Sequence, residues 1–279
     1  MSLLATRDLT IRFGGHVAVN NVTCSFEPGT LTAIVGPNGA GKTTYFNLIS
    51  GQLKATGGSV TLDGRDLSGQ SPSERTRAGL GRAFQLTNLF PRLTVLENVR
   101  LAVQATREGR HRRGLNLWSI WSDHQDLTAR ADQILRDVAM ADQAQELVAN
   151  LPHGDQRKLE VALLMALESK VFMFDEPTAG MNAAEAPVIL NLIRKLKEDP
   201  TTTILLVEHK MDVVRELADR IIVLHNGTLV ADGEPAQVIA SPIVQEAYLG
   251  VAPEAVRAEP VEAVASPSTG SGRTEGGRP

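Results

Sequence analysis

The chain has 279 residues, enough to bury a sizeable core, and we expect one composite domain. Its net charge of −4, with both signs interspersed, provides no basic field for holding nucleic acid, so a nucleic-acid partner is disfavoured. The single cysteine, Cys24, excludes an internal disulfide, and charged residues follow the N-terminus too closely for a secretory signal, which favours a reducing cytosol.

The first part of the chain carries the pattern of β-strands. Residues 3–35 alternate apolar and polar positions between turn signals, as antiparallel strands do, and residues 31–35 form a short apolar run typical of a buried strand. Residues 58–63 add another short strand. We therefore expect an antiparallel β subdomain at the N-terminus.

The middle of the chain is predicted to be mostly helical, from about residue 73 to residue 167. An amphipathic stretch at residues 127–140 is its clearest member. The pattern predicts an inserted helical subdomain at about residues 86–165. The longest apolar run, residues 161–167, is far shorter than the roughly 20 residues of a membrane-spanning helix, so we expect no membrane span.

A β, α, β rhythm follows the helical part. Apolar runs at residues 171–174 and 203–207, with a helical stretch at 184–197 between them, predict parallel strands at the centre of a sheet. Asn226 and Gly227 lie between two further apolar runs, which is a strong hairpin signal, and this hairpin should close the sheet edge.

The last segment of the chain differs in composition from the rest. After residue 250 the sequence is rich in Ala, Pro, Glu, Ser and Gly, which cannot bury enough apolar surface to offset the entropy of ordering. We therefore predict a folded domain at residues 1–250 and a disordered C-terminal tail at residues 251–279.

One motif carries most of the functional information, the segment GPNGAGKT at residues 36–43. Two glycines with four positions between them, then lysine and threonine, fit a phosphate-binding loop. Glycines allow backbone angles closed to other residues, so successive amides can turn toward the β and γ phosphates of a nucleotide. The expected nucleotide-binding residues here are Gly36, Pro37, Asn38, Gly39, Ala40, Gly41, Lys42, Thr43 and Thr44.

Charged and hydroxyl side chains at this loop have separable tasks. Lys42 can reach the phosphates as a point charge, and Thr43 can ligate Mg²⁺ at the start of a helix whose positive end points at the phosphates. Two carboxylates at the end of a predicted strand supply the remaining groups of the site. On the usual logic of phosphoryl transfer, Asp175 would help hold Mg²⁺ and Glu176 would polarise the attacking water.

With these motifs the chain resembles the nucleotide-binding subunits of ATP-binding cassette (ABC) transporters over about residues 3–250. Gln85, in RAFQLTNLF, matches the glutamine loop of that family, and His209, in ILLVEH, matches its switch histidine. The resemblance implies that Gln85 contacts Mg²⁺ or the attacking water and that His209 contacts the γ phosphate. Phe13 lies where the family stacks an aromatic ring on adenine.

The same resemblance implies a fold class and a set of cofactors. The fold would be the α/β fold of phosphate-loop NTPases, with a RecA-like parallel core sheet, an N-terminal antiparallel β subdomain and an inserted α-helical subdomain. The cofactors would be ATP and Mg²⁺, and the reaction would be hydrolysis of ATP coupled to transport.

The family signature, usually LSGGQ, is represented by LPHGD: Leu151, Pro152, His153, Gly154 and Asp155. In the family this loop caps the γ phosphate of ATP held by the opposite subunit. Pro152 has neither a hydroxyl nor an amide proton, and Asp155 brings negative charge toward phosphate. The donors expected to remain are the amides of His153, Gly154 and Asp155.

Further segments resemble one branch of importers, those for branched-chain amino acids and related amides or urea. These segments are RFGGHVAVNNV at 12–22, RAFQ at 82–85, AGMN at 179–182, VEHKMDVV at 207–214 and AYLG at 247–250. The implied partners are a second cassette subunit, identical or not, two permease subunits and, indirectly, an extracytoplasmic binding protein. The chain would then be peripheral, on the cytoplasmic face of the membrane.

Three other functions compete with this hypothesis. The first is a cassette subunit for another substrate or for export. The second is a soluble cassette protein acting on nucleic acid or the ribosome, which a single phosphate loop and the absence of sustained heptads disfavour. The third is a nucleotide sensor that does not hydrolyse. Asp175, Glu176 and His209 argue against it, whereas Pro152 and Asp155 keep it open.

Overall fold

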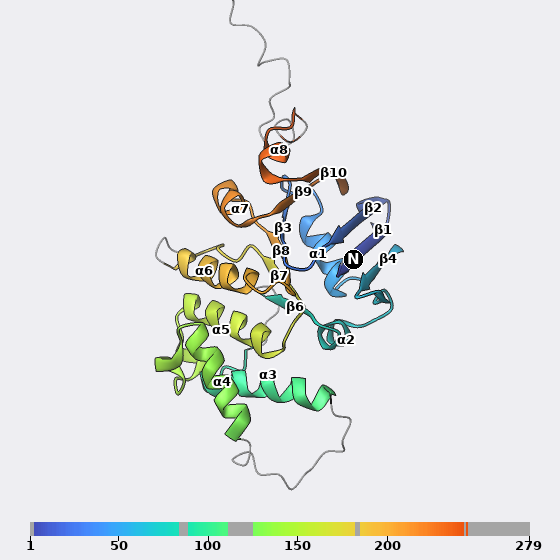
Figure 1. Cartoon of the computed structure of the whole chain (residues 1–279). Helices are drawn as coiled ribbons and strands as arrows, with labels where there is room; N and C mark the ends of the chain where they lie inside the picture. Colours follow the sequence, from blue (N-terminus) through green and yellow to red (C-terminus); the bar gives the residue numbers. More distant parts are fainter. Residues whose placement is uncertain (1–2, 84–88, 111–124, 182–184, 243, 245–279) are drawn as a thin grey trace, which may run out of the picture.

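The computed structural model of the chain describes residues 3–83, 89–110, 125–181, 185–242 and 244 (Figure 1). Its strands are β1 (Leu4–Phe13), β2 (His16–Phe26), β3 (Leu31–Val35), β4 (Gly57–Leu62), β5 (Arg65–Asp66), β6 (Leu80–Ala83), β7 (Val171–Asp175), β8 (Thr203–Val207), β9 (Arg220–His225) and β10 (Thr228–Gly233). Its α-helices are α1 (Lys42–Ser50), α2 (Pro72–Arg77), α3 (Val95–Arg110), α4 (Gln125–Asp137), α5 (His153–Ala166), α6 (Ala186–Lys197), α7 (Met211–Leu217) and α8 (Pro235–Ile239).

The strands form two sheets. A four-stranded sheet has the order β2-β1-β4-β5, and its neighbours are antiparallel. A six-stranded sheet has the order β10-β9-β3-β8-β7-β6, in which only β10 is antiparallel to its neighbour. The hairpin predicted at Asn226 and Gly227 joins β9 to β10 and puts β10 at the edge of this sheet, as expected.

Side chains of the central strands alternate between the two faces of the sheet, because successive residues of a strand point to opposite faces. On one face Ile34, Met173 and Leu205 pack with α1 and the antiparallel sheet. On the other face Phe172 and Leu206 pack with helices α3 to α6. The central sheet is therefore covered on both sides, and Figure 1 shows the antiparallel sheet and these helices on opposite sides of it.

Local sequence signals explain where several helices begin. At α2, Ser71 and Glu74 form a reciprocal capping box. At α3, the Thr94 hydroxyl accepts from the Glu97 amide at 3.2 Å, while the Glu97 carboxylate accepts from the Thr94 amide at 2.8 Å. The predicted helix at 127–140 is found as α4. None of the helices in the described residues combines the length and apolar character that crossing a bilayer requires.

One sequence-based expectation was wrong and another was incomplete. Residues 31–35 were grouped with the antiparallel strands, but β3 lies in the central sheet, parallel to β8 and β9. The described part of the stretch from 73 to 167 is mostly helical, as expected, but it also contains β6, which pairs with β7. Both strands are short and covered on both faces, so neither carries the strict alternation that identifies a half-exposed strand. The predicted tail at 251–279 lies outside the described residues.

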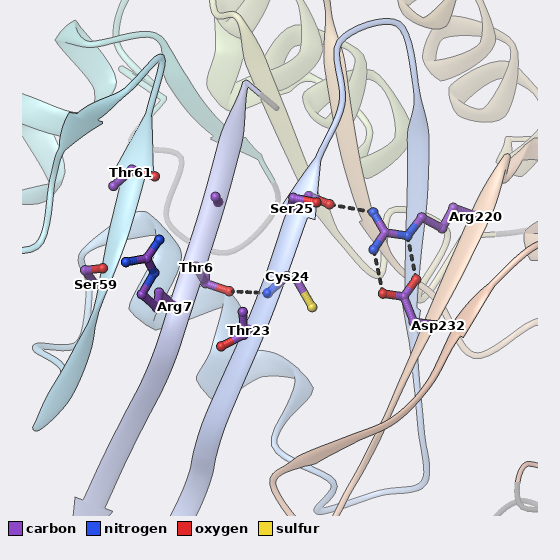
Figure 2. Close-up of a pocket in the computed structure, with 10 residues that line it drawn as sticks. Thr6, Arg7, Thr23, Cys24, Ser25, Ser59, Thr61, Arg220 and Asp232 are labelled. Carbon is purple, nitrogen blue, oxygen red and sulfur yellow. Dashed lines mark hydrogen bonds and ion pairs between the residues drawn. The ribbon is translucent and has the colours of Figure 1, made fainter. Parts of the chain in front are cut away.

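Arg220 joins the two sheets. Its guanidinium donates to both carboxylate oxygens of Asp232, each at 2.5 Å, and also to the carbonyl of Ser25 on β2 (Figure 2). This pair closes one end of a pocket of about 450 Å³. In its wall, the Cys24 amide donates to the Thr6 hydroxyl at 3.2 Å. Burial raises the pKa of the Cys24 thiol to about 11, so this thiol is neutral at physiological pH.

Arg75 fixes the far end of α1. It is 3% exposed, and its Nη1 donates to the carbonyls of Leu48 at 2.7 Å and Ile49 at 2.6 Å in the last turn of the helix. The Leu48 carbonyl also accepts from the amide of the C-cap residue Gly51 at 3.3 Å. The helix that starts at the phosphate loop is thus held at its C-terminus by a buried cation, the charge that complements that end of a helix.

Replacing Arg75 by methionine should lower the free energy of unfolding by about 1–3 kcal/mol, because the carbonyls of Leu48 and Ile49 both lose the hydrogen bond from the buried guanidinium. Urea denaturation measures this change. The matched control is Arg77→Met, two residues along α2 at an exposed position, which should change stability by less than about 0.5 kcal/mol. Equal denaturation midpoints for the two variants would contradict the capping role of Arg75.

Candidate functional site

A pocket of about 270 Å³ lies where the carboxyl ends of the central parallel strands meet the antiparallel sheet. Ligand sites of open α/β sheets are found at this edge. The pocket is lined by His16, Ala18, Asn38, Gly39, Ala40, Gly41, Lys42, Thr43, Thr44, Glu176 and His209. The structure thus brings most of the loop together with Glu176 and His209, which lie far from it in the sequence.

The loop depends on glycine at two positions where other backbone comes very close. A Cβ on Gly36 would lie 2.1 Å from the carbonyl oxygen of Leu224, and one on Gly41 would lie 2.5 Å from that of Ala18. Both glycines also have positive φ, 151° and 96°. No other residue fits either position without moving neighbouring backbone.

Lys42 lies folded over its own loop. Its Nζ donates to the carbonyls of Gly36 at 2.7 Å and Pro37 at 3.0 Å. Burial lowers the pKa of Lys42, and the nearby carboxylates of Glu176 and Asp175 act in the opposite direction. An anionic group entering the pocket would therefore meet an ammonium whose present partners are neutral carbonyls.

The N-terminus of α1 opens onto the same pocket. Gly41 is its N-cap, and no side chain caps it. The first turn contains no acidic residue, and Thr43 and Thr44 line the pocket beside the helix amides. Free amides at a positive helix end form a site for a phosphate group.

Asp175 is paired with Arg82 at the end of β7. Arg82 Nη2 lies 3.0 Å from Asp175 Oδ2, and both side chains are less than a tenth exposed. Arg82 Nη1 also donates to Asn47 Oδ1 at 2.6 Å and Ser50 Oγ at 2.9 Å on α1. Burial raises the pKa of Asp175, and Arg82 opposes this shift. Arg82 therefore joins the acidic strand end to the helix of the phosphate loop.

Glu176 and His209 form the second contact between site residues. Glu176 Oε1 lies 2.8 Å from His209 Nε2, and each side chain is about two-fifths exposed. Glu176 has a φ of 51°, which is uncommon for a residue other than glycine, and its amide donates to the Val207 carbonyl at 2.9 Å. The ends of β7 and β8 thus hold these two side chains against each other.

Two buried residues around these contacts were missed as site residues from the sequence. Arg82 was noted only as part of RAFQ, although a cation within a short buried strand is itself a signal, since buried charges require partners. Glu208 was noted only as part of VEHKMDVV; it is 3% exposed and contacts Thr178. Gln85, the predicted glutamine-loop residue, and Asn182, the last residue of the AGMN segment, lie outside the described residues.

Phe13 is the last residue of β1 and is half exposed. It does not line the pocket, but it pairs in the β1–β2 register with His16, which does. The exposed ring therefore belongs to the hairpin that forms one rim of the pocket.

The segment LPHGD does not line this pocket; it begins α5. Pro152 is the N-cap, and its carbonyl accepts from the amides of Asp155 at 3.1 Å and Gln156 at 3.0 Å. The expectation of three available amides was therefore wrong for Asp155, whose amide is already used within the first turn. The amides of His153 and Gly154 remain at the helix start, and Leu151 is buried behind it.

The charge of Asp155 is compensated locally. Its carboxylate accepts from Lys158 Nζ at 2.7 Å and from Gln143 Nε2 at 3.0 Å. Burial alone would raise the pKa of Asp155, but these two hydrogen bonds outweigh it and the pKa lies below its usual value. The negative charge of Asp155 is thus paired with Lys158, one turn along α5.

Comparison with known proteins matches these features to one family. Residues 19–179 match the family model described as ABC transporter. The high-affinity branched-chain amino acid transport ATP-binding protein LivG of Salmonella typhimurium is 39% identical over 251 residues, which are 90% of this chain and 98% of that protein.

Solved structures agree with the sequence relatives. The ADP conformation of MJ1267, an ATP-binding cassette of an ABC transporter, has a TM-score of 0.75 and 30% identity, covering 90% of this chain and 100% of that one. A dimeric post-hydrolysis state of the cassette MJ0796, bound to ADP and Pi, has a TM-score of 0.69 and 26% identity, covering 83% and 98%. The predicted phosphate-loop fold is confirmed, and the chain belongs to the ABC transporter family as one of its ATP-hydrolysing cassettes.

Proposed function

We propose that this chain drives an importer for branched-chain amino acids, or for related amides or urea, from the cytoplasmic face of the membrane. The pocket that joins the phosphate loop to Glu176 and His209 carries the ATPase part of this proposal. The substrate class is supported by the transport named for LivG, to which this chain is similar along nearly its whole folded length. The chain would act beneath permease subunits and a binding protein outside.

In the proposed site, each group has one task. Lys42 leaves the carbonyls of Gly36 and Pro37 and pairs with the β and γ phosphates, which the amides at the start of α1 also contact. Glu176 orients and polarises the water that attacks the γ phosphorus, and His209 contacts the γ phosphate. Phe13 offers its exposed ring to the adenine.

Mg²⁺ fits the donors present at this edge. In nucleotide sites Mg²⁺ is bound by one or two protein oxygens together with phosphate oxygens and water. Thr43 supplies a hydroxyl in the pocket, and the Asp175 carboxylate uses one oxygen for Arg82. Gln85 is the third proposed ligand. When bound, the ion would neutralise charge on the phosphates.

A second cassette would complete the site. The LPHGD segment lies away from the pocket of its own chain, at the start of α5. We propose that it faces the nucleotide of a partner cassette, with the amides of His153 and Gly154 as donors. The dimeric state of the similar cassette MJ0796 supports this arrangement. A monomer would then hydrolyse ATP poorly.

Lys42→Ala should abolish ATP binding, because the main cation of the pocket is lost. Glu176→Gln should keep ATP binding and lower turnover by about 10²–10⁴-fold, since only the base is removed. Both are measured on the chain assembled with its partners, by equilibrium binding and by phosphate release. The exposed positions Lys54→Ala and Glu198→Gln serve as controls and should behave as wild type. Normal turnover by Glu176→Gln would reject the role given to Glu176.

In the presence of Mg²⁺, Asp175→Asn should weaken ATP binding by at least about tenfold, because most of the affinity that Mg²⁺ adds is lost. In EDTA, without Mg²⁺, the affinity for ATP should change little. Asparagine keeps an oxygen for Arg82 but loses the charge that attracts the cation. Titration of ATP with and without Mg²⁺ measures both quantities. An unchanged response to Mg²⁺ would show that Asp175 is not a ligand.

A further inference from the structure

Glu208 is a buried carboxylate directly before His209, and both of its oxygens are used. Oε1 accepts from the Thr178 hydroxyl at 2.6 Å, and Oε2 accepts from the amide of His209 at 3.0 Å and, more weakly, from that of Lys210 at 3.4 Å. Glu208 and Thr178 are 3% and 2% exposed. A buried carboxylate is tolerated only with such partners, so this side chain fixes the backbone that carries His209.

Thr178 belongs to the turn that carries Glu176. The Ala179 amide donates to the Glu176 carbonyl at 3.0 Å, which closes a turn around Thr178. The Thr178 hydroxyl therefore joins the segment after β7 to the segment after β8. Glu208 accepts this hydrogen bond, and His209 directly follows Glu208 in the sequence.

A second link lies on the other side of the Glu176–His209 contact. The Glu176 amide donates to the Val207 carbonyl at 2.9 Å, and the strand register pairs Asp175 with Val207. The contact between Glu176 and His209 is thus bracketed by a backbone bond and by the Thr178–Glu208 bond. Together they hold two side chains from neighbouring strands at 2.8 Å.

Glu176 needs this support because of its backbone. A φ of 51° costs of order 1 kcal/mol or more in a residue with a Cβ, and it persists only when surrounding contacts fix it. Thr178 lies two residues further along and is fully buried, so its hydroxyl is well placed to stabilise the turn in this conformation.

We propose that Glu208, acting through Thr178, is a positioning residue that holds Glu176 and His209 in catalytic alignment across the ends of β7 and β8. This inference rests on the proposed roles of Glu176 and His209. Neither Glu208 nor Thr178 lines the nucleotide pocket, so their effect is on the alignment of the reacting groups and not on the affinity for ATP. Misplacement of a reacting group by about 1 Å can cost about 10²-fold in rate.

The test compares Thr178→Val, which is nearly isosteric and lacks the hydroxyl, with Thr178→Ser, which keeps it. Each variant is made in the full chain and assembled with its partner subunits. Thr178→Val should lower kcat by about 10- to 100-fold while KM for ATP changes less than about twofold, and Thr178→Ser should restore kcat to within about threefold of wild type. Glu208→Gln, which keeps the shape of the Glu208 side chain, should lower kcat in the same way. This variant tests the proposal independently if Thr178→Val does not fold.

A matched control removes a similar bond elsewhere. Thr201 donates its hydroxyl to Asp199 Oδ1 at 2.7 Å on the exposed surface, so Thr201→Val should leave both constants unchanged. Wild-type kcat in Thr178→Val or in Glu208→Gln would overturn the proposal. The proposal would also be overturned if Thr178→Val and Thr178→Ser lowered kcat equally, or if only KM changed. Active Glu176→Gln refutes the proposed catalytic role of Glu176, whereas inactive Glu176→Gln beside normal Thr178→Val refutes only this inference.

Discussion

The phosphate loop is held between backbone segments of both sheets, and the geometry of the whole site depends on this fit. Carbonyls of Leu224 on β9 and Ala18 on β2 occupy the space where side chains of Gly36 and Gly41 would begin. The hairpin after β9 adds a bond from the Gly227 amide to the Ala40 carbonyl at 3.0 Å. These close backbone contacts constrain the loop, and its residues from Asn38 to Thr43 line the pocket before any ligand arrives.

Around this loop, Lys42, Asp175 and Glu176 each already have a partner inside the protein. Lys42 contacts two loop carbonyls, Asp175 contacts Arg82, and Glu176 contacts His209. The buried pair is expensive to break, because either partner alone would be an unpaired buried charge, whereas the half-exposed pair is weak. Nucleotide binding on our account exchanges the partners of Lys42 and of the Glu176–His209 pair, while the Arg82–Asp175 pair stays in place. The rigid and the exchangeable parts of the site are therefore distinct.

The sequence predicted those features whose signal is local. The loop 36–43, the strand ending at Asp175 and the hairpin at Asn226 are each set by a few consecutive residues, and the structure contains all three. The roles of Arg82 and of Thr178 with Glu208 could not be predicted, because their side chains meet only through the strand order β3-β8-β7-β6. The orientation of residues 31–35 was missed because this short strand is buried on both faces and carries no alternation. The Asp155 amide was expected to be available to a phosphate, but it donates to the Pro152 carbonyl in the first turn of α5, which the sequence motif alone does not reveal.

The central claim is that the loop, the ends of β7 and β8 and Lys42 form one preformed phosphate site. A crystal structure of the chain with Mg²⁺ and a non-hydrolysable ATP analogue tests it most directly. We predict that Lys42 Nζ has left the carbonyls of Gly36 and Pro37 for the β and γ phosphates, with the loop backbone unmoved and Arg82 still on Asp175. A nucleotide bound elsewhere, or Lys42 still on those carbonyls with the analogue present, would contradict the claim.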